Sequence, residues 1–286
     1  MHEWGYAPSL PALASGLLGG DVPPGTLSAA LQDSATIRHK RGFVFLRGHE
    51  ALVDDSRRRT AADRILNGHA RTIAKAFAQD LASVCPMVEC ICLSGSVASG
   101  GYERGDDIDF DLFVKPGTKY LCYLLATLLG IRYSLRYRGL RTSRLHRTPF
   151  LPKITCINVV WPGDQTRPFS RQDLGLAFEL LRCQPLHGAR RFQEVLRDNP
   201  WIAGFFPQIR ERIWFDAVGG PPSRIGRLVA AASTHPRLLR IIERASRTLA
   251  WLLYTAVQAV RARDPTARAR MEFLRRVKFP YEVFQD

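Results

Sequence analysis

The chain has 286 residues, enough for one large or two ordinary domains, and its apolar content of 46% supplies a core without disulfide staples. Its formal net charge of +15 at pH 7 points to an anionic partner such as nucleic acid, nucleotide phosphates or an acidic surface, with a codon preference for arginine as the alternative cause. No secretory signal opens the sequence, and its most apolar windows, 121–131 and 249–260, are shorter than the roughly 20 residues of a membrane span. We therefore expect a cytoplasmic protein without a membrane span.

Residues 8–35 contain short apolar stretches broken by GG and PPG, and the segments TIRHK and FVFLRG follow on either side of Arg41 and Gly42. This pattern predicts two helices and a two-stranded ribbon that turns at residues 40–42. The arrangement resembles a winged helix. The resemblance implies either a nucleic-acid contact or a docking module, because a fold does not dictate its function.

The pattern of the central part of the chain predicts an α/β fold. Apolar residues at helical spacing predict one long helix from residue 54 to about residue 82. A nearly continuous apolar run at 88–95 predicts a strand buried on both faces, and the alternating segment 107–114 predicts a second strand. A buried helix at 119–133 and a third strand at 154–161 follow.

From residue 170 onward the pattern is helical, with breaks that contain Pro or Gly at 219–222 and 264–265. The segment 237–260 has too many apolar residues for one narrow stripe, so we expect it to be buried or shared with another chain in an oligomer. The expected organisation is a winged-helix-like module at 1–53, an α/β core at 54–168 and a helical region at 169–286.

The six cysteines form no CxxC pair, and most of them lie in apolar runs. They are Cys85, Cys90, Cys92, Cys122, Cys156 and Cys183. A reduced thiol in such surroundings behaves as a small hydrophobic side chain. We therefore expect all six to be structural.

One segment, residues 93–114, concentrates aspartates in an otherwise basic chain. On the predicted strand, Asp107, Asp109 and Asp111 project from one face and alternate with apolar residues on the other. Carboxylates on one face repel one another unless divalent cations lie among them, and hard oxygen ligands are those that Mg²⁺ selects. The acidic face of this strand therefore predicts a metal site.

Gly95 and Ser96 end the strand before the acidic one. A turn with free backbone N–H groups and a serine hydroxyl can hold phosphate oxygens. Metal on one strand and phosphate on its neighbour would bridge the same triphosphate. That combination is typical of phosphoryl and nucleotidyl transfer, where catalysis is mainly positioning and charge neutralisation.

The segment GSVASGGYERGDDIDFD resembles the signature of the polymerase-β-like nucleotidyltransferases, in which a Gly-Ser pair is followed after about ten residues by Asp-x-Asp on the next strand. The resemblance implies a small mixed sheet, binding of a nucleoside triphosphate such as ATP by Gly95 and Ser96, and coordination of two Mg²⁺ ions by Asp107 and Asp109. It also implies transfer of a nucleoside monophosphate to an acceptor hydroxyl or phosphate, with release of pyrophosphate. The start of the chain and the run AFELLRCQPLHG…DNPWIAGFFP are similar to bacterial nucleotidyltransferase-domain proteins.

That family commonly carries a third carboxylate on a later strand, where it completes the metal site and can help to deprotonate the acceptor. The corresponding strand here, 154–161, has no acid, and its candidate ligand is Asn158, whose amide cannot act as a base. Three alternatives follow. In the first, Asp111 or an acid from elsewhere, such as Glu179 or Asp173, provides the third carboxylate. In the second, the acceptor carries its own negative charge and needs no base. In the third, the chain has lost catalytic activity.

The segment from Arg132 to Lys153 is rich in arginine and contains no acid. If the segment lies beside the cleft, its basic side chains would bind the leaving pyrophosphate, and Lys153 is a tentative site residue. If it lies elsewhere, it would contact a nucleic-acid backbone or form a solvated loop. A small-molecule acceptor is favoured because the core lacks a recognisable polymerase apparatus, and RNA or protein is second. The rival hypothesis is a catalytically inactive nucleic-acid-binding regulator that uses the winged-helix-like module and the arginine-rich segments.

Overall fold

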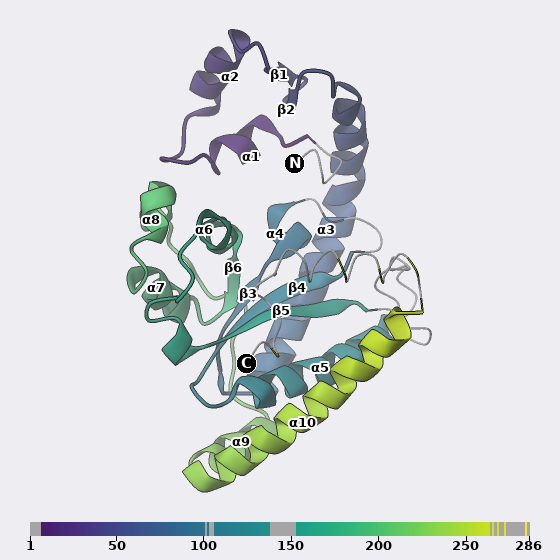
Figure 1. Ribbon diagram of the computed structural model, residues 1–286, viewed down its shortest axis with the longest axis vertical. Helices are drawn as coiled ribbons and strands as arrows, with labels where there is room; N and C mark the ends of the chain where they lie inside the picture. The colour runs from purple at the N-terminus through teal and green to yellow at the C-terminus, as the bar shows by residue number, and fades with distance from the viewer. Residues whose placement is uncertain are drawn as a thin grey trace.

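The computed structural model describes residues 7–100, 102, 106–137 and 153–263, together with the single positions 265, 268, 272 and 284. Over these residues the chain combines helices with a four-stranded sheet and a separate two-stranded ribbon (Figure 1). The expected mixture of α and β structure is therefore confirmed. Most of the arginine-rich segment, residues 138–152, lies outside the described residues, so the expectations for it stay predictions.

The N-terminal elements follow the expected order of two helices and a ribbon. They are α1 (Leu10–Ala14), α2 (Pro24–Gln32), β1 (Ile37–Lys40) and β2 (Phe43–Leu46). Arg41 and Gly42 connect the two antiparallel strands with φ angles of 53° and 83°. Two positive φ angles are typical of the two-residue turn whose twist matches paired strands. The ribbon therefore turns where the sequence predicted.

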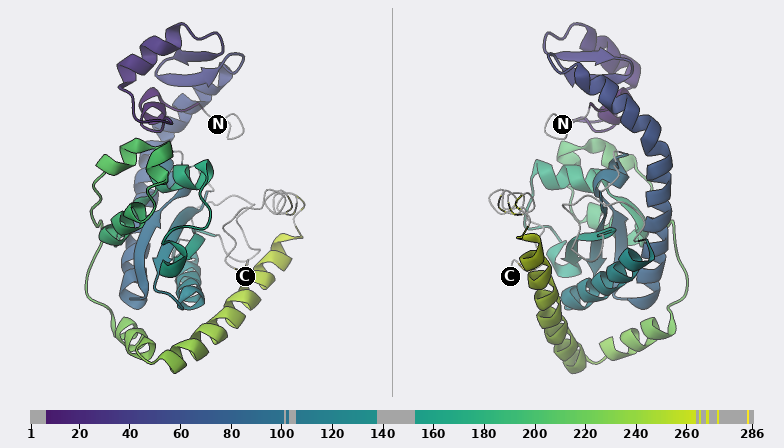
Figure 2. Two further views of the ribbon diagram at one scale, coloured as in Figure 1. Left: turned by 60° about the vertical axis from the view of Figure 1, so that its left-hand side comes forward. Right: turned by 90° about the vertical axis from the view of Figure 1, so that its right-hand side faces the viewer.

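A single long helix, α3 (Ala51–Val84), joins this module to the sheet (Figure 2). Its 34 residues span about 50 Å at 1.5 Å per residue. Near its start Val53 packs against Phe45 of the ribbon, and further along Phe77 and Leu81 are fully buried in the main core. The helix predicted from residue 54 is confirmed, and it begins early enough to cross the expected boundary at residues 53 and 54.

The sheet is small and mixed. Its strands are β3 (Val88–Leu93), β4 (Ile108–Val114), β5 (Thr155–Pro162) and β6 (Gln184–His187), in the order β5-β4-β3-β6. β4 and β5 are parallel, whereas β3 is antiparallel to both β4 and β6. Three of these strands lie where the sequence predicted them. The expectation of only helices after residue 170 was wrong, because the short segment around Pro185 adds an edge strand, where a sheet tolerates proline.

Helices cover both faces of this sheet (Figures 1 and 2). α3 and α5 (Lys119–Arg136) bury the face that carries Ile108, Phe110 and Leu112. The other face carries Phe113 and is covered by α6 (Leu174–Arg182), α7 (Ala189–Arg197) and α8 (Ile202–Phe205). The alternation predicted for β4 is confirmed, and it directs the two sets of side chains into separate cores.

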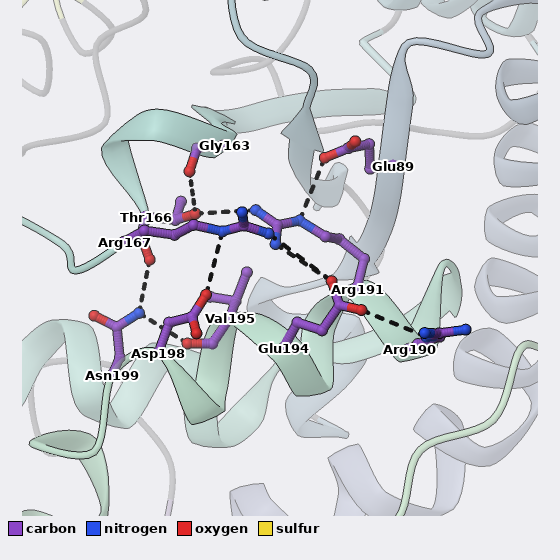
Figure 3. A network of polar contacts seen from close by, with 10 residues as sticks. All are labelled: Glu89, Gly163, Thr166, Arg167, Arg190, Arg191, Glu194, Val195, Asp198 and Asn199. Atoms are coloured by element: carbon purple, nitrogen blue, oxygen red, sulfur yellow. Dashed lines mark hydrogen bonds and ion pairs between the residues drawn. The ribbon is translucent and has the colours of Figure 1, made fainter.

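A buried arginine holds one end of the sheet to α7 (Figure 3). Arg191 Nε lies 3.3 Å from Glu89 Oε2 on β3, and its Nη1 lies 3.5 Å from Glu194 Oε2. Its Nη2 donates to Thr166 Oγ1 at 3.3 Å, beside the 3₁₀ helix η3 (Gly163–Gln165) that follows β5. A buried guanidinium requires such partners. This network lies at the end of the sheet opposite to the aspartates that begin β4.

The remaining helical elements are η4 (Pro207–Glu211), α9 (Arg224–Ser233) and α10 (Pro236–Arg261). α10 lies along α5, where Glu243 accepts hydrogen bonds from the backbone N–H groups of Tyr120 at 2.8 Å and Leu121 at 2.9 Å (Figure 1). Ile241, Trp251 and Leu252 of α10 stay exposed. The part of the chain that the structure describes has no helix that is long and apolar enough to cross a bilayer.

Candidate functional site

The connection between β3 and β4 brings a glycine directly against an aspartate. A short helix, α4 (Gly95–Ser99), follows β3 in place of the turn that the sequence predicted, and Gly95 has a φ of 61°. A Cβ atom at Gly95 would overlap Oδ2 of Asp109, and the Ser94 N–H donates to the Asp109 carbonyl oxygen at 3.0 Å. Only glycine satisfies both the left-handed backbone and this close approach.

The N-terminus of α4 is partly exposed to solvent. Ser94 stands at the N-cap, but its hydroxyl does not cap the helix and instead donates to Asp111 Oδ1 at 3.0 Å. The first N–H groups of a helix have no acceptor within it. Because Gly95 is exposed and Ser96 is half-buried, these groups lie open to a ligand beside Asp109.

Asp107, Asp109 and Cys156 form a cluster in which the potential ligand atoms lie within 4.8 Å of one another. Asp109 on β4 pairs with Cys156 on β5 in the parallel register, and Asp107 directly precedes β4. Two carboxylates provide the hard oxygen donors of a Mg²⁺ site, and a thiol adds a softer donor that suits transition metals. These donors fit a divalent cation.

Burial disfavours ionisation at this cluster. Loss of solvation raises the pKa of the Asp109 carboxyl well above its usual value, and the nearby Asp107 carboxylate raises it further. Burial likewise raises the pKa of the Cys156 thiol, so that this side chain is protonated at neutral pH. A cation placed among these groups would relieve both costs.

Lys153 is the basic residue of the cluster. Its Nζ lies 2.8 Å from Asp107 Oδ2 and donates to Cys156 Sγ, also at 2.8 Å. Desolvation opposes the charge on the amine, yet the Asp107 carboxylate holds the pKa of Lys153 above its usual value. Lys153 is therefore an ammonium ion at neutral pH, in direct contact with the acidic group.

Asp111 projects from the same face of β4 as Asp109 but has a different environment. It is buried, and its carboxylate accepts hydrogen bonds from Ser94 Oγ at 3.0 Å, Asn158 Nδ2 at 3.1 Å and Cys183 Sγ at 3.3 Å. Asn158 Nδ2 also donates to Glu179 Oε1 at 2.9 Å. Asp111, Asn158 and Glu179 are thus joined to one another in a polar cluster between the sheet and α6.

Asp173 lies outside this cluster. It is the N-cap of α6, where its carboxylate accepts the Leu176 N–H at 2.9 Å and pairs with Arg171. The hydrogen bond from Arg171 lowers the pKa of Asp173. Its carboxylate therefore caps α6. Of Glu179 and Asp173, the two acids considered from the sequence, Glu179 is the one that contacts the polar cluster.

Three side chains from other elements donate to successive carbonyl oxygens at the end of α4. These bonds run from Arg71 on α3 to Val97 (3.2 Å), from Gln184 on β6 to Ala98 (2.7 Å) and from Arg182 on α6 to Ser99 (3.3 Å). Gln184 Oε1 also accepts a hydrogen bond from Arg71 Nη1 at 2.7 Å. We call Arg71, Arg182 and Gln184 the α4 anchors, because they fix the helix that begins with Gly95.

Sequence reasoning missed Cys156 and the α4 anchors as parts of the site. On the predicted strand 154–161, Cys156 shares a face with Asn158, whereas Ile157 projects from the other face. Parallel pairing of this strand with the acidic one is the signal that could have found Cys156. No local pattern marks the α4 anchors, because they come from three elements that meet only in the folded chain.

Comparisons of the chain with protein-family models, with curated proteins and with solved structures each return no match. Function is therefore inferred from the geometry and chemistry of the residues described above.

Proposed function

We propose that the chain is a metal-dependent nucleotidyltransferase, with a core of the polymerase-β-like type at residues 54–168 and a winged-helix-like module before it. The observation that carries this proposal is the close approach of the Gly95 backbone to the Asp109 carboxylate. In nucleotidyl transfer, a phosphate-binding turn and a metal-binding carboxylate must reach the same triphosphate. The arrangement of β3, α4 and β4 supports that requirement.

Each residue of the site has a distinct role in this proposal. Asp107 and Asp109 hold Mg²⁺, for which the family resemblance implies two ions. The N–H groups of Gly95 and Ser96, together with the Ser96 hydroxyl, bind the phosphates of ATP or another nucleoside triphosphate. When bound, Mg²⁺ neutralises charge on the triphosphate and on the departing pyrophosphate. The α4 anchors keep the phosphate-binding turn in place.

The environment of the acids favours an acceptor that is already ionised. Asn158 is an amide and cannot take a proton, and the Cys156 thiol has a raised pKa. The oxygens of Asp111 already accept three hydrogen bonds. A phosphate or carboxylate acceptor needs no general base, so we favour a small anionic molecule, with RNA or protein as the second class of acceptor.

The test is Mg²⁺-dependent pyrophosphate release from labelled nucleoside triphosphates offered together with small phosphate and carboxylate acceptors. We expect turnover by the wild type and a loss of about 100-fold or more in Asp109→Asn, the order of effect for removing a group that acts electrostatically on the transition state. Asp164→Asn, an exposed aspartate in η3, is the matched control and should keep wild-type turnover. Equal activity in Asp109→Asn and the wild type would refute the proposal.

A second candidate function is an inactive nucleic-acid-binding regulator. It is favoured by one observation, the exposed Lys40 and Arg41 at the tip of the β1-β2 ribbon in a chain with a net charge of +15. This function would be supported if the protein shows no turnover but binds duplex DNA. That binding should weaken with added salt and should be unchanged in Asp109→Asn.

A further inference from the structure

We infer that the Lys153 ammonium group occupies one cation position of the candidate site, so that the protein binds one divalent ion rather than two. The inference rests on the proposed function and revises its count of metal ions. Lys153 Nζ is 2.8 Å from Asp107 Oδ2 and 2.8 Å from Cys156 Sγ, so it contacts two members of the metal-binding cluster directly.

The backbone fixes Lys153 at this position. The Ile108 N–H, next to Asp107, donates to the carbonyl oxygen of Ile154, next to Lys153, at 2.9 Å. This bond holds the residues just before β5 against the start of β4. The register aligns Ile108 with Thr155 and Asp109 with Cys156, so Lys153 lies two residues before the partner of Ile108 and reaches Asp107 with its long side chain. The Asp107 side chain is largely shielded from solvent, at 10% exposed, and the Lys153 side chain is half-buried, at 35% exposed. The pairing of β4 with β5 therefore brings Lys153 within reach of Asp107, and the ion pair completes the contact.

An ammonium and a metal ion compete for the same place. Mg²⁺ binds a carboxylate oxygen at about 2.0–2.1 Å and would have to displace Nζ from the space between Asp107 and Cys156. Two cations packed against one carboxylate would also repel each other strongly at low effective dielectric. While Lys153 remains in place, this side of the cluster is closed to a divalent ion.

The other side of the cluster is formed by the Asp109 carboxylate. Among the residues that the structure describes, no basic side chain forms an ion pair with Asp109, whose carboxylate faces Gly95 at the start of α4. A divalent ion at Asp109 would lie between that carboxylate and a triphosphate held by the Gly95 and Ser96 N–H groups. The site thus combines one exchangeable metal ion with one permanent organic cation.

The experiment counts Mn²⁺ ions bound to the full chain by electron paramagnetic resonance, with Mn²⁺ alone and no nucleotide. We expect one ion in the wild type and in Lys153→Arg, which keeps the charge, and two ions in Lys153→Met and Lys153→Gln. Lys115→Met, an exposed lysine just after β4, is the matched control and should bind one ion. Circular dichroism of each variant checks that it folds.

Several outcomes would overturn the inference. One is the same count in the wild type and both neutral variants. Another is tighter binding of a single ion without a second one, because relief of charge repulsion alone predicts that result. Loss of binding in folded Lys153→Met and Lys153→Gln would also overturn it, since Lys153 would then support the metal ligands. Turnover is a separate assay, so the expected counts without turnover would refute the proposed transferase while leaving the Lys153 inference intact.

Discussion

At the scale of single residues, Gly95 combines two separate constraints. Its φ of 61° lies in the left-handed region, and its missing Cβ leaves room for Asp109 Oδ2. Gly100, at the other end of α4, has a φ of 78° but open space around it. The pair therefore separates the cost of backbone strain from the cost of crowding the carboxylate.

We predict that Gly100→Ala lowers the free energy of unfolding by about 1 kcal/mol, the cost of the left-handed conformation for a residue with a Cβ. Gly95→Ala should cost more, because Asp109 must also move, and it should weaken Mn²⁺ binding, which Gly100→Ala leaves unchanged. Urea unfolding and Mn²⁺ titration measure the two effects. Equal losses of stability and unchanged Mn²⁺ binding in both variants would contradict the steric argument.

Asp111 provides a prediction of pH dependence. Burial raises its pKa, and the hydrogen bonds from Cys183, Asn158 and Ser94 offset only part of that shift. The folded protein therefore holds the proton more tightly than the unfolded chain, so this group contributes stability at low pH that is lost as the pH rises through the raised pKa.

We therefore predict that the wild type loses stability relative to Asp111→Asn as the pH rises above about 4, the ordinary pKa of an aspartate. The loss amounts to about 1.4 kcal/mol for each unit by which folding raises the pKa. Chemical unfolding of both proteins across this range measures the difference. A difference that stays constant with pH would show that Asp111 titrates alike in the folded and unfolded states.

At the scale of elements, α4 is too short to hold its own position. Its five residues depend on neighbours, and the α4 anchors bond its last three carbonyl oxygens from α3, α6 and β6. The hydrogen bonds from the anchors to α4 run to its C-terminal end, away from Gly95. They position the turn that begins at Gly95, on which the proposed phosphate binding depends.

We predict that Arg71→Met lowers the free energy of unfolding by about 1–3 kcal/mol, because it removes hydrogen bonds from a charged group to Val97 and Gln184. It should weaken binding of a nucleoside triphosphate several-fold while Mn²⁺ binding stays near the wild-type value. Lys75→Met, an exposed basic residue one turn later on α3, is the control and should change neither. Equal weakening of triphosphate and Mn²⁺ binding in Arg71→Met would argue against a specific role for α4.

At the scale of the whole molecule, the candidate site lies where the acidic end of β4 meets the start of β5, and the Arg191 network closes the opposite end of the sheet (Figures 1 and 3). The ribbon module stands at the far end of α3 from the sheet's core helices (Figure 2). Nucleotide chemistry and a nucleic-acid contact would thus use different parts of the chain. The net charge of +15 therefore need not come from residues that bind the nucleotide.

The long helices α3 and α5, three of the four strands of the sheet and the alternation that places Asp109 and Asp111 on one face could be predicted from the sequence, because these depend on local periodicity. The sequence also marked Gly95 as part of a turn next to the acidic strand. The gathering of Cys156 and Lys153 around Asp107 emerged from the folded chain, since it depends on the parallel pairing of β4 with β5 and on the reach of the Lys153 side chain. The tertiary structure likewise decided the edge strand β6 and the anchoring of α4, because both result from contacts between segments that are distant in the chain, which no local pattern records.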